Sequence, residues 1–298
     1  MPERNLVNFK YRSGAAALRS LSDGTCYFAH AGELNDSLEA KFALADPSSY
    51  AQTLALTLTE LAQHRNEPVM YEPEEASAEH LAKLIREEDA TFAANCLRVG
   101  IFSGTKRPDN QPMWAYYCND GHGVCFEFEW PDEVIESFSL RPTFVHYTDQ
   151  PRVHDRFEDL REELLASGKR HPDWTVERLH DHVGSREFFA RWMARSMSRA
   201  ASTKHADWAH EHELRMVSPK AGPLPILKQI LKRVYFTRFD FPEFASIVLL
   251  LRQHYPAVEI AQVKFGHSAP LVAIEPARFR LVPVAAPASV ADHSADGG

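Results

Sequence analysis

The chain has 298 residues and a formal net charge of −8, with 44% hydrophobic and 25% charged residues. These are globular values, and a chain this long buries a sizeable core without disulfides or metals. The negative charge argues against nonspecific attraction to nucleic acid or an anionic membrane, although a local basic patch could still bind either.

Alternating and aromatic-rich patterns predict strands at 5–12, 25–30, 98–104, 124–130, 144–149, 232–237 and 258–266. Helices are predicted at 13–24, 48–66, 75–98 and 241–254, with a short helix within 107–123. A long helical segment is predicted over 151–205, broken at Pro172 and Gly184. The polar stretch 31–39 is predicted as a loop.

Strands at the start, middle and end of the chain, with helices between them, favour an α+β fold. We expect a single mixed domain over residues 1–282, with a central, mostly antiparallel sheet and flanking helices. Helical insertions are expected at about 48–98 and 151–205. The tail 283–298 is rich in Ala, Pro, Ser, Asp and Gly and is predicted to be disordered.

The four cysteines, Cys26, Cys96, Cys118 and Cys125, form no CxxC pair and are predicted to be buried thiols rather than a disulfide or zinc framework. The N-terminus is charged where a signal peptide is apolar, and no apolar run reaches the roughly 18 residues of a membrane span. We therefore expect a cytoplasmic protein. Phosphate-loop, Rossmann, serine-hydrolase and zincin motifs are absent from the sequence.

The stretch ADWAHEHELRMV (206–217) is the densest in ionisable groups. If 208–217 is extended, Glu211 and Glu213 share a face with Arg215. The two glutamates could then face a cleft, where one contacts a substrate hydroxyl and the other stabilises a developing cation. The alternative is a solvated strand face with a weak surface ion pair.

The same alternation places His210 and His212 on the opposite face, with Trp208. They could form an HxH metal pair, or lie at the edge of a core, each hydrogen-bonded through one nitrogen. No third ligand cluster is evident in the sequence, so we expect no metal.

The stretch PMWAYYCNDGHGVCFEF (112–128) is rich in aromatic residues. Trp114, Tyr116 and Tyr117 could stack on a planar ring, and His122 is accessible between two glycines. The alternative is an amphipathic helix that buries its aromatics. Arg12, at the end of the first strand, could grip a phosphate or carboxylate, or form a structural salt bridge.

In this order, these stretches resemble a prokaryotic family named domain of unknown function 2971. The matching residues are Tyr11–Arg12, Tyr27–Phe28, Glu33-Leu34-Asn35-Asp36, Glu39, 112–117, 123–128, Trp208, Glu211, 213–215 and Phe265–Gly266. The resemblance runs over most of residues 8–282. The family tends to have Asn-Asp-Pro where this chain has Asn35-Asp36-Ser37.

A looser similarity is to the arginine-type ADP-ribosyltransferases. It rests on an early strand ending in Arg, a "YFA" strand after a short helix, and a later Glu-x-Glu. The resemblance implies that Arg12 holds NAD, that Glu213 stabilises the ribosyl cation, and that Glu211 orients the acceptor. The Ser-Thr-Ser strand of that superfamily has no clear counterpart in this sequence. Ser103-Gly104-Thr105 is a poor substitute, so Tyr27-Phe28-Ala29 would have to serve instead.

The first resemblance indicates a family without an assigned biochemistry, whereas the looser one implies an NAD-consuming enzyme, either an ADP-ribosyltransferase or an NAD glycohydrolase. A bacterial toxin or antiviral effector that modifies a protein or nucleic acid would suit this activity. The expected catalytic residues are Glu213 and Glu211. The expected NAD-binding residues are Arg12, Tyr27, Phe28, Asn35, Trp114, Tyr117 and His122. The alternatives are a non-catalytic nucleotide- or protein-binding module and a metal-dependent nuclease that uses His210 and His212.

Overall fold

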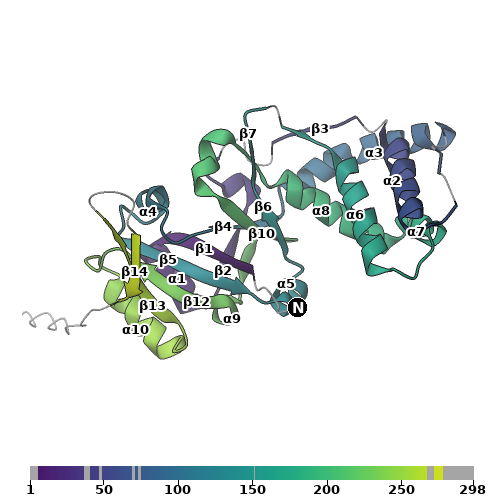
Figure 1. Ribbon diagram of the computed structural model, residues 1–298. Coiled ribbons are helices and arrows are strands. Elements are labelled where there is room, and N and C mark those ends of the chain that lie inside the picture. Colours follow the sequence, from purple (N-terminus) through teal and green to yellow (C-terminus); the bar gives the residue numbers. More distant parts are fainter. Residues whose placement is uncertain are drawn as a thin grey trace, which may run out of the picture.

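A computed structural model describes residues 6–36, 41–46, 49–68, 71–72, 75–150, 152–266 and 272–277 (Figure 1). The helices are α1 (Gly14–Asp23), α2 (Tyr50–His64), α3 (Glu75–Cys96), α4 (Gln111–Tyr117), α5 (Asp132–Ser137), α6 (Arg156–Arg170), α7 (Val176–Val183), α8 (Arg186–Ala200), α9 (Leu227–Ile230) and α10 (Phe244–His254). Short 3-10 helices are η1 (Ala31–Glu33) and η3 (Ala206–Glu211).

The strands of the main sheet are β1 (Leu6–Ser13), β2 (Cys26–His30), β4 (Gly100–Thr105), β5 (Gly123–Trp130), β6 (Arg141–Phe144), β10 (Glu213–Ser218), β11 (Gly222–Leu224), β12 (Leu231–Phe236), β13 (Glu259–Phe265) and β14 (Val272–Pro276). Smaller pairings join β3 (Ala43–Leu44) to β8 (Val153–His154) and β7 (His146–Thr148) to β9 (Thr203–His205).

In the described residues the main sheet has ten strands in the order β11-β2-β4-β1-β5-β12-β13-β14, and β10 joins β4 to β6. Its described neighbours are antiparallel except β12 and β13, which are parallel. The predicted α+β class with a mostly antiparallel central sheet is therefore confirmed.

The sheet divides along one edge of β4. β10 occupies the other edge over the whole strand, from Glu213 opposite Thr105 to Ser218 opposite Gly100. Both β1 and β2 must therefore pair on the remaining edge. β1 meets β4 only at Phe9 and Thr105, whereas β2 meets it at 100–101, so the two strands diverge around residue 103.

Gly104 allows the close contact at the base of this division. A Cβ atom there would lie 2.5 Å from the Asn8 Nδ2 atom and 3.1 Å from the Phe9 carbonyl oxygen. Any larger residue would push β1 away from β4, because these distances are shorter than van der Waals contact.

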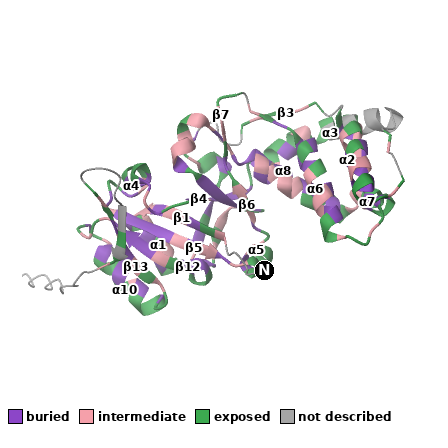
Figure 2. Ribbon diagram, viewed as in Figure 1, coloured by how far each residue is buried: buried purple, intermediate pink, exposed green. Residues whose placement is uncertain are grey.

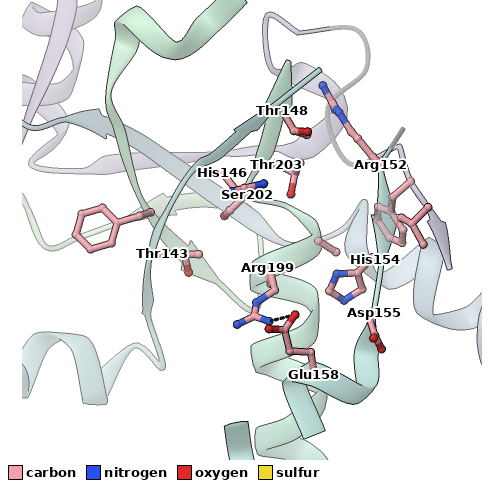
Figure 3. Close-up of a pocket in the computed structure, with 14 residues that line it drawn as sticks. Thr143, His146, Thr148, Arg152, His154, Asp155, Glu158, Arg199, Ser202 and Thr203 are labelled. Carbon is pink, nitrogen blue, oxygen red and sulfur yellow. Dashed lines mark ion pairs between the residues drawn. The ribbon is translucent and has the colours of Figure 1, made fainter. Parts of the chain in front are cut away.

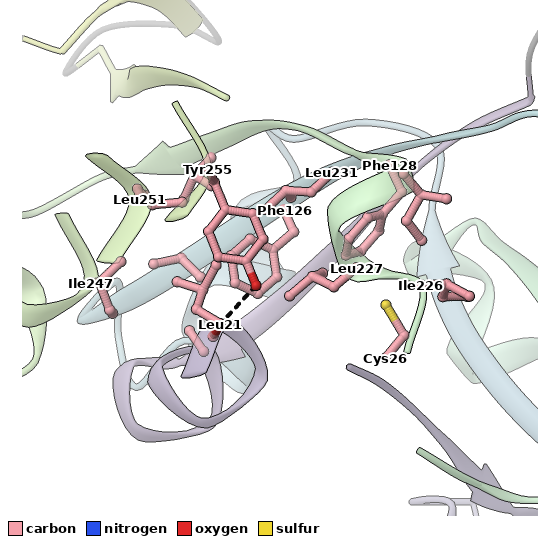
Figure 4. Close-up of a cluster of buried hydrophobic side chains, with 14 of the residues drawn as sticks. Leu21, Cys26, Phe126, Phe128, Ile226, Leu227, Leu231, Ile247, Leu251 and Tyr255 are labelled. Carbon is pink, nitrogen blue, oxygen red and sulfur yellow. Dashed lines mark hydrogen bonds between the residues drawn. The ribbon is translucent and has the colours of Figure 1, made fainter. Parts of the chain in front are cut away.

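One face of the sheet packs against α1 and α10 to form the main core (Figure 4). Leu21 of α1 and Leu251 of α10 lie in the same cluster as Phe126 of β5, and the Tyr255 hydroxyl donates to the Leu21 carbonyl at 2.8 Å. α1 begins at the predicted cap Ser13, whose Oγ accepts from the Ala16 amide. Figure 2 shows the buried residues along the sheet strands.

The helices of the two predicted insertions pack together beside the sheet (Figure 1). α2, α6, α7 and α8 share a second core, which includes Leu58, Leu164, Leu179, Phe188 and Trp192. The chain breaks between these helices at the predicted sites, since α6 ends at Arg170 before Pro172 and Gly184 caps α7.

Two stretches differ from the sequence analysis, one considered as extended and one predicted as a strand. The stretch 208–217 is not extended throughout, because residues 206–211 form η3, His212 is left-handed at φ 47°, and β10 begins at Glu213. The predicted strand 144–149 is divided between β6 and β7. The tail 283–298 and residues 37–39 of the predicted loop lie outside the described residues.

The four cysteines are buried and free, as predicted. Within the described residues, no helix combines the length and the apolar character needed to cross a membrane.

Candidate functional site

The diverging strands β1 and β2 open a cavity of about 260 Å³, which we call the split-sheet pocket. It is lined by Phe9, Lys10, Tyr11, Arg12, Tyr27, Ala29, Glu33, Leu34, Asn35, Ile101, Ser103, Gly104, Met113, Tyr117, Glu211 and Glu213. Six of the nine predicted site residues lie among these. They are Arg12, Tyr27, Asn35, Tyr117, Glu211 and Glu213. The pocket therefore brings together segments that are up to two hundred residues apart.

Two cations from β1 line one wall of the pocket. The Lys10 Nζ atom donates to the Ser103 carbonyl at 2.5 Å, where the edge of β4 opposite β10 is paired with neither β1 nor β2, and it lies 4.6 Å from the centre of the Phe102 ring. Arg12 follows on the same strand. Among the described residues, neither cation has a carboxylate within ion-pair distance. Burial, and for Lys10 also the charge of Arg12, lowers both pKa values.

The opposite wall is a buried cluster of two carboxylates and two cations. Lys204 of β9 bridges the pair, since its Nζ atom lies 2.6 Å from Glu211 Oε2 and 2.5 Å from Glu213 Oε1. The Arg215 Nε atom donates to Glu213 Oε2 at 2.7 Å. All four side chains are at most 5% exposed. The alternative of a solvated strand face is therefore wrong, and the shared face of Glu213 and Arg215 is confirmed.

A chain of hydrogen bonds leads from this cluster to the pocket rim. The Tyr117 hydroxyl donates to Glu211 Oε1 at 2.5 Å and accepts from Asn35 Nδ2 at 2.5 Å. The Tyr147 hydroxyl accepts from the Glu213 amide at 2.9 Å. Every side-chain oxygen of Glu211 and Glu213 therefore has a donor within the protein.

The two glutamates have opposite pKa shifts because their surroundings differ. Burial, together with the neighbouring Glu213, raises the pKa of Glu211. Burial also opposes ionisation of Glu213, but Arg215, Glu211 and Lys204 together hold its pKa well below the ordinary range. Glu213 is thus the anion of the pair and Glu211 the group that takes up a proton first. Burial and the bond to Glu211 raise the pKa of Tyr117.

Three predicted site residues lie elsewhere. Phe28 is fully buried in the main core, because it alternates with Tyr27 and faces Phe102. Trp114 is buried against Tyr11, and its Nε1 atom donates to the Pro108 carbonyl. His122 packs on its own turn, where its Nδ1 atom lies 2.8 Å from the Asn119 carbonyl oxygen. None of these three predicted residues lines the split-sheet pocket.

The expected pairing of His210 and His212 on one strand face is also wrong. His210 belongs to η3, and its Nδ1 atom lies 3.0 Å from the Asp207 carbonyl oxygen. His212 is exposed at the left-handed turn. Within the described ranges, no group of three or more His, Cys, Asp or Glu side chains is placed to hold a metal ion.

Lys204 is the main site residue that the sequence analysis missed. It lies in a three-residue strand directly after α8 and has no motif around it. The available signal was indirect: two glutamates that are both buried and only two residues apart are expected to have a cation near them.

A larger cavity of about 600 Å³, which we call the junction cavity, lies where the helices meet β6, β7 and β9 (Figure 3). Its cations already have partners within the protein. Arg199 contacts Glu158, Asp159 and Glu162, and Arg152 contacts Asp36 at 3.0 Å. Of the two cavities, the split-sheet pocket is therefore the better candidate for an anionic ligand.

The family described as "Protein of unknown function (DUF2971)" has a model that matches residues 113–216. The matched segment includes Tyr117, Lys204, Glu211 and Glu213, and it supports the resemblance to that family over this part of the chain. Comparisons with curated proteins and with solved structures give no match.

Proposed function

We propose that the split-sheet pocket binds NAD and that the protein cleaves the bond between nicotinamide and ribose. The observation that carries this proposal is the excess positive charge of the β1 wall. Lys10 and Arg12 face the pocket without a carboxylate partner among the described residues. A pyrophosphate carries the complementary charge, and a guanidinium binds its oxygens in a bidentate fashion.

The carboxylate cluster supports the reaction that we assign to the pocket. As the nicotinamide leaves as a neutral molecule, positive charge develops on the ribose, and the ionised Glu213 would stabilise it. A hydroxyl of water or of a macromolecular acceptor then attacks the anomeric carbon and passes its proton to Glu211, the carboxylate of the pair with the raised pKa. Glu211 lines the pocket and is suited to accept a hydrogen bond from that hydroxyl. Its Oε1 atom now accepts the hydrogen bond of Tyr117, which is half-buried and also lines the pocket.

The same contacts favour a second candidate, a nucleotide-binding module without catalysis. All four oxygens of Glu211 and Glu213 accept hydrogen bonds from Tyr117, Lys204 and Arg215. In such a module the cluster shapes the pocket, and the β1 cations hold the ligand.

Incubation with labelled NAD and cell lysate, reading free nicotinamide and labelled macromolecules, distinguishes the two candidates. We expect Glu213→Gln to lower nicotinamide release by roughly 100-fold or more, because an amide carries no charge to stabilise the ribosyl cation. Glu259→Gln is the matched control, since Glu259 is exposed and pairs with Arg233 far from the pocket.

The folded state of each variant is checked by its cooperative unfolding transition. Saturable NAD binding without nicotinamide release in the wild-type protein would favour the binding module. A folded Glu213→Gln variant with wild-type turnover would contradict the catalytic role of Glu213.

A further inference from the structure

A second concave surface adjoins the split-sheet pocket, and we call it the aromatic pocket. It has a volume of about 560 Å³ and is lined by Asn35, Tyr116, Tyr117, Asp207, Trp208 and His210. Asn35 and Tyr117 line both pockets, and their hydrogen bond forms the wall between them. A ligand that passes over this pair would occupy both.

Three planar side chains gather around the aromatic pocket. The His210 ring lies 6.2 Å from that of Tyr116 and 6.3 Å from that of Trp208, centre to centre, and its plane is 27° from the Trp208 plane. Tyr116 is 72% exposed, so much of its ring is available to a ligand. Exposed aromatic faces of this kind stack on planar heteroaromatic rings.

Two contacts hold η3, which carries Trp208 and His210, in place without a ligand. The Asn110 Nδ2 atom donates to the His210 carbonyl at 2.7 Å, which ties η3 to the residue before α4. The Lys204 Nζ atom lies 4.9 Å from the centre of the Trp208 ring, so the carboxylate cluster supports the indole from within. A preorganised pocket loses less entropy on binding than a flexible one.

The volumes of the two pockets also suit a ligand that extends across both, with its phosphates in one and its base in the other. The split-sheet pocket, at about 260 Å³, is smaller than the roughly 300–1,000 Å³ of most small-molecule sites. It accommodates phosphates and a ribose but not a complete dinucleotide. The adjoining aromatic pocket supplies the remaining space together with the rings that a base requires.

We propose that the aromatic pocket binds the planar base of a nucleotide whose phosphates lie against Lys10 and Arg12. This inference rests on the proposed binding of a nucleotide in the split-sheet pocket, but not on its cleavage. Tyr116 and Trp208 supply the stacking faces. The hydrogen-bonded Asn35 and Tyr117 lie between the base and the phosphates.

Calorimetry on the full-length protein tests this inference with four probes: ADP-ribose, AMP, nicotinamide mononucleotide and inorganic pyrophosphate. We expect Tyr116→Ala to weaken ADP-ribose binding by roughly 5- to 100-fold, the loss typical of one base–aromatic stack, and to leave pyrophosphate binding unchanged. Trp208→Ala should act in the same direction, and Trp208→Phe should retain most of the affinity. Phe189→Ala is the matched control, because Phe189 is an exposed aromatic residue on α8 outside both pockets.

The two mononucleotides identify the base. If Tyr116→Ala weakens AMP binding the aromatic pocket holds adenine, and if it weakens nicotinamide mononucleotide binding the pocket holds nicotinamide. ADP-ribose binding that Tyr116→Ala and Trp208→Ala leave unchanged would overturn the inference. It would also be overturned if these variants weaken pyrophosphate as much as ADP-ribose, or if the wild-type protein binds none of the probes.

Nicotinamide release, measured separately, distinguishes the two proposals. Tyr116-dependent ADP-ribose binding without release keeps this inference and rejects the catalytic proposal. Nicotinamide release with the same KM for NAD in the wild-type protein and Tyr116→Ala keeps the catalytic proposal and rejects this inference.

Discussion

The junction cavity and the split-sheet pocket both contain arginines, but they use them differently. In the junction cavity, Arg199 contacts three carboxylates of α6. In the split-sheet pocket, Lys10 and Arg12 face the cavity with no carboxylate partner among the described residues, although a carboxylate pair lies on the opposite wall. In the larger cavity, carboxylates of the protein therefore neutralise Arg199. In the smaller one, the positive charges of Lys10 and Arg12 remain available to a ligand. The charge balance of a cavity is more informative than its size.

The largest effect is expected when the shared cation of the carboxylate pair is removed. Lys204→Met leaves Glu211 and Glu213 buried beside each other without the ammonium group that bridges them. We expect the free energy of unfolding to fall by about 3–5 kcal/mol, as is usual when one partner of a buried ion pair is lost. Urea denaturation measures this change.

Lys232→Met is the matched control, because Lys232 is 47% exposed and pairs with Glu129 at the surface. It should cost at most about 1 kcal/mol. Equal losses in the two variants would contradict the assignment of Lys204 as the shared cation of the cluster.

Removal of a β1 cation should affect the ligand more than the fold. Arg12→Met should weaken ADP-ribose binding by roughly 10- to 100-fold, the value of a charge-assisted hydrogen bond of about 1.5–3 kcal/mol. Stability should hold or rise, because the half-buried guanidinium has no carboxylate partner among the described residues. Calorimetry measures the affinity, and urea denaturation of the same preparation measures the stability. A destabilised variant with unchanged affinity would contradict a ligand-binding role for Arg12.

Glu211 and Glu213 should make contributions to the free energy of unfolding that change with pH in opposite directions. The raised pKa of Glu211 gives a contribution that is complete below its unfolded value, 4.5, and is lost as pH rises through the folded value. The lowered pKa of Glu213 gives a contribution that is present above 4.5 and is lost as pH falls.

Urea midpoints of Glu211→Gln and Glu213→Gln, compared with wild type across the acid range, separate these slopes. Glu211→Gln should remove a decline on the alkaline side, and Glu213→Gln should remove a decline on the acid side. Identical pH profiles in the three proteins would be inconsistent with the cluster described here.

The smallest effect on ligand affinity is expected in the junction cavity. Arg199 is 35% exposed, but the Asp159 carboxylate that it contacts is fully buried, so Arg199→Gln should lower the free energy of unfolding by about 1–3 kcal/mol. Affinity for ADP-ribose should not change. A loss of affinity similar to that of Arg12→Met would erase the distinction between the two cavities.

The fold could be predicted from hydrophobic periodicity and from helix-capping signals. Ser13 and Gly24 mark both ends of α1, and Gly184 ends α7. Alternation also contained information that the site prediction did not use. Tyr27 and Phe28 are neighbours in a strand and cannot both face one pocket, and Phe28 took the core side.

The site was harder to predict because tertiary contacts decide it. Tyr117 and Trp114 lie on one short helix, yet only Tyr117 reaches the pocket, while Trp208 lines the neighbouring one from η3. The convergence of Glu211 and Glu213 was expected from a strand that does not exist at residue 211. Lys204 bridges them instead, and its position depends on the pairing of β9 with β7, where Lys204 lies opposite Tyr147.

The left-handed residue His212 forms a turn between Glu211 and Glu213, and the conformation of this turn sets the spacing of their two carboxylates. In an extended strand, inserting one residue would move every following side chain to the opposite face. An insertion within η3 could instead reposition Glu211 while the six residue pairs of β10 with β4, and with them Glu213, stay in register. Related chains could therefore vary the geometry of this site through loop length alone, without rebuilding the sheet that supports it.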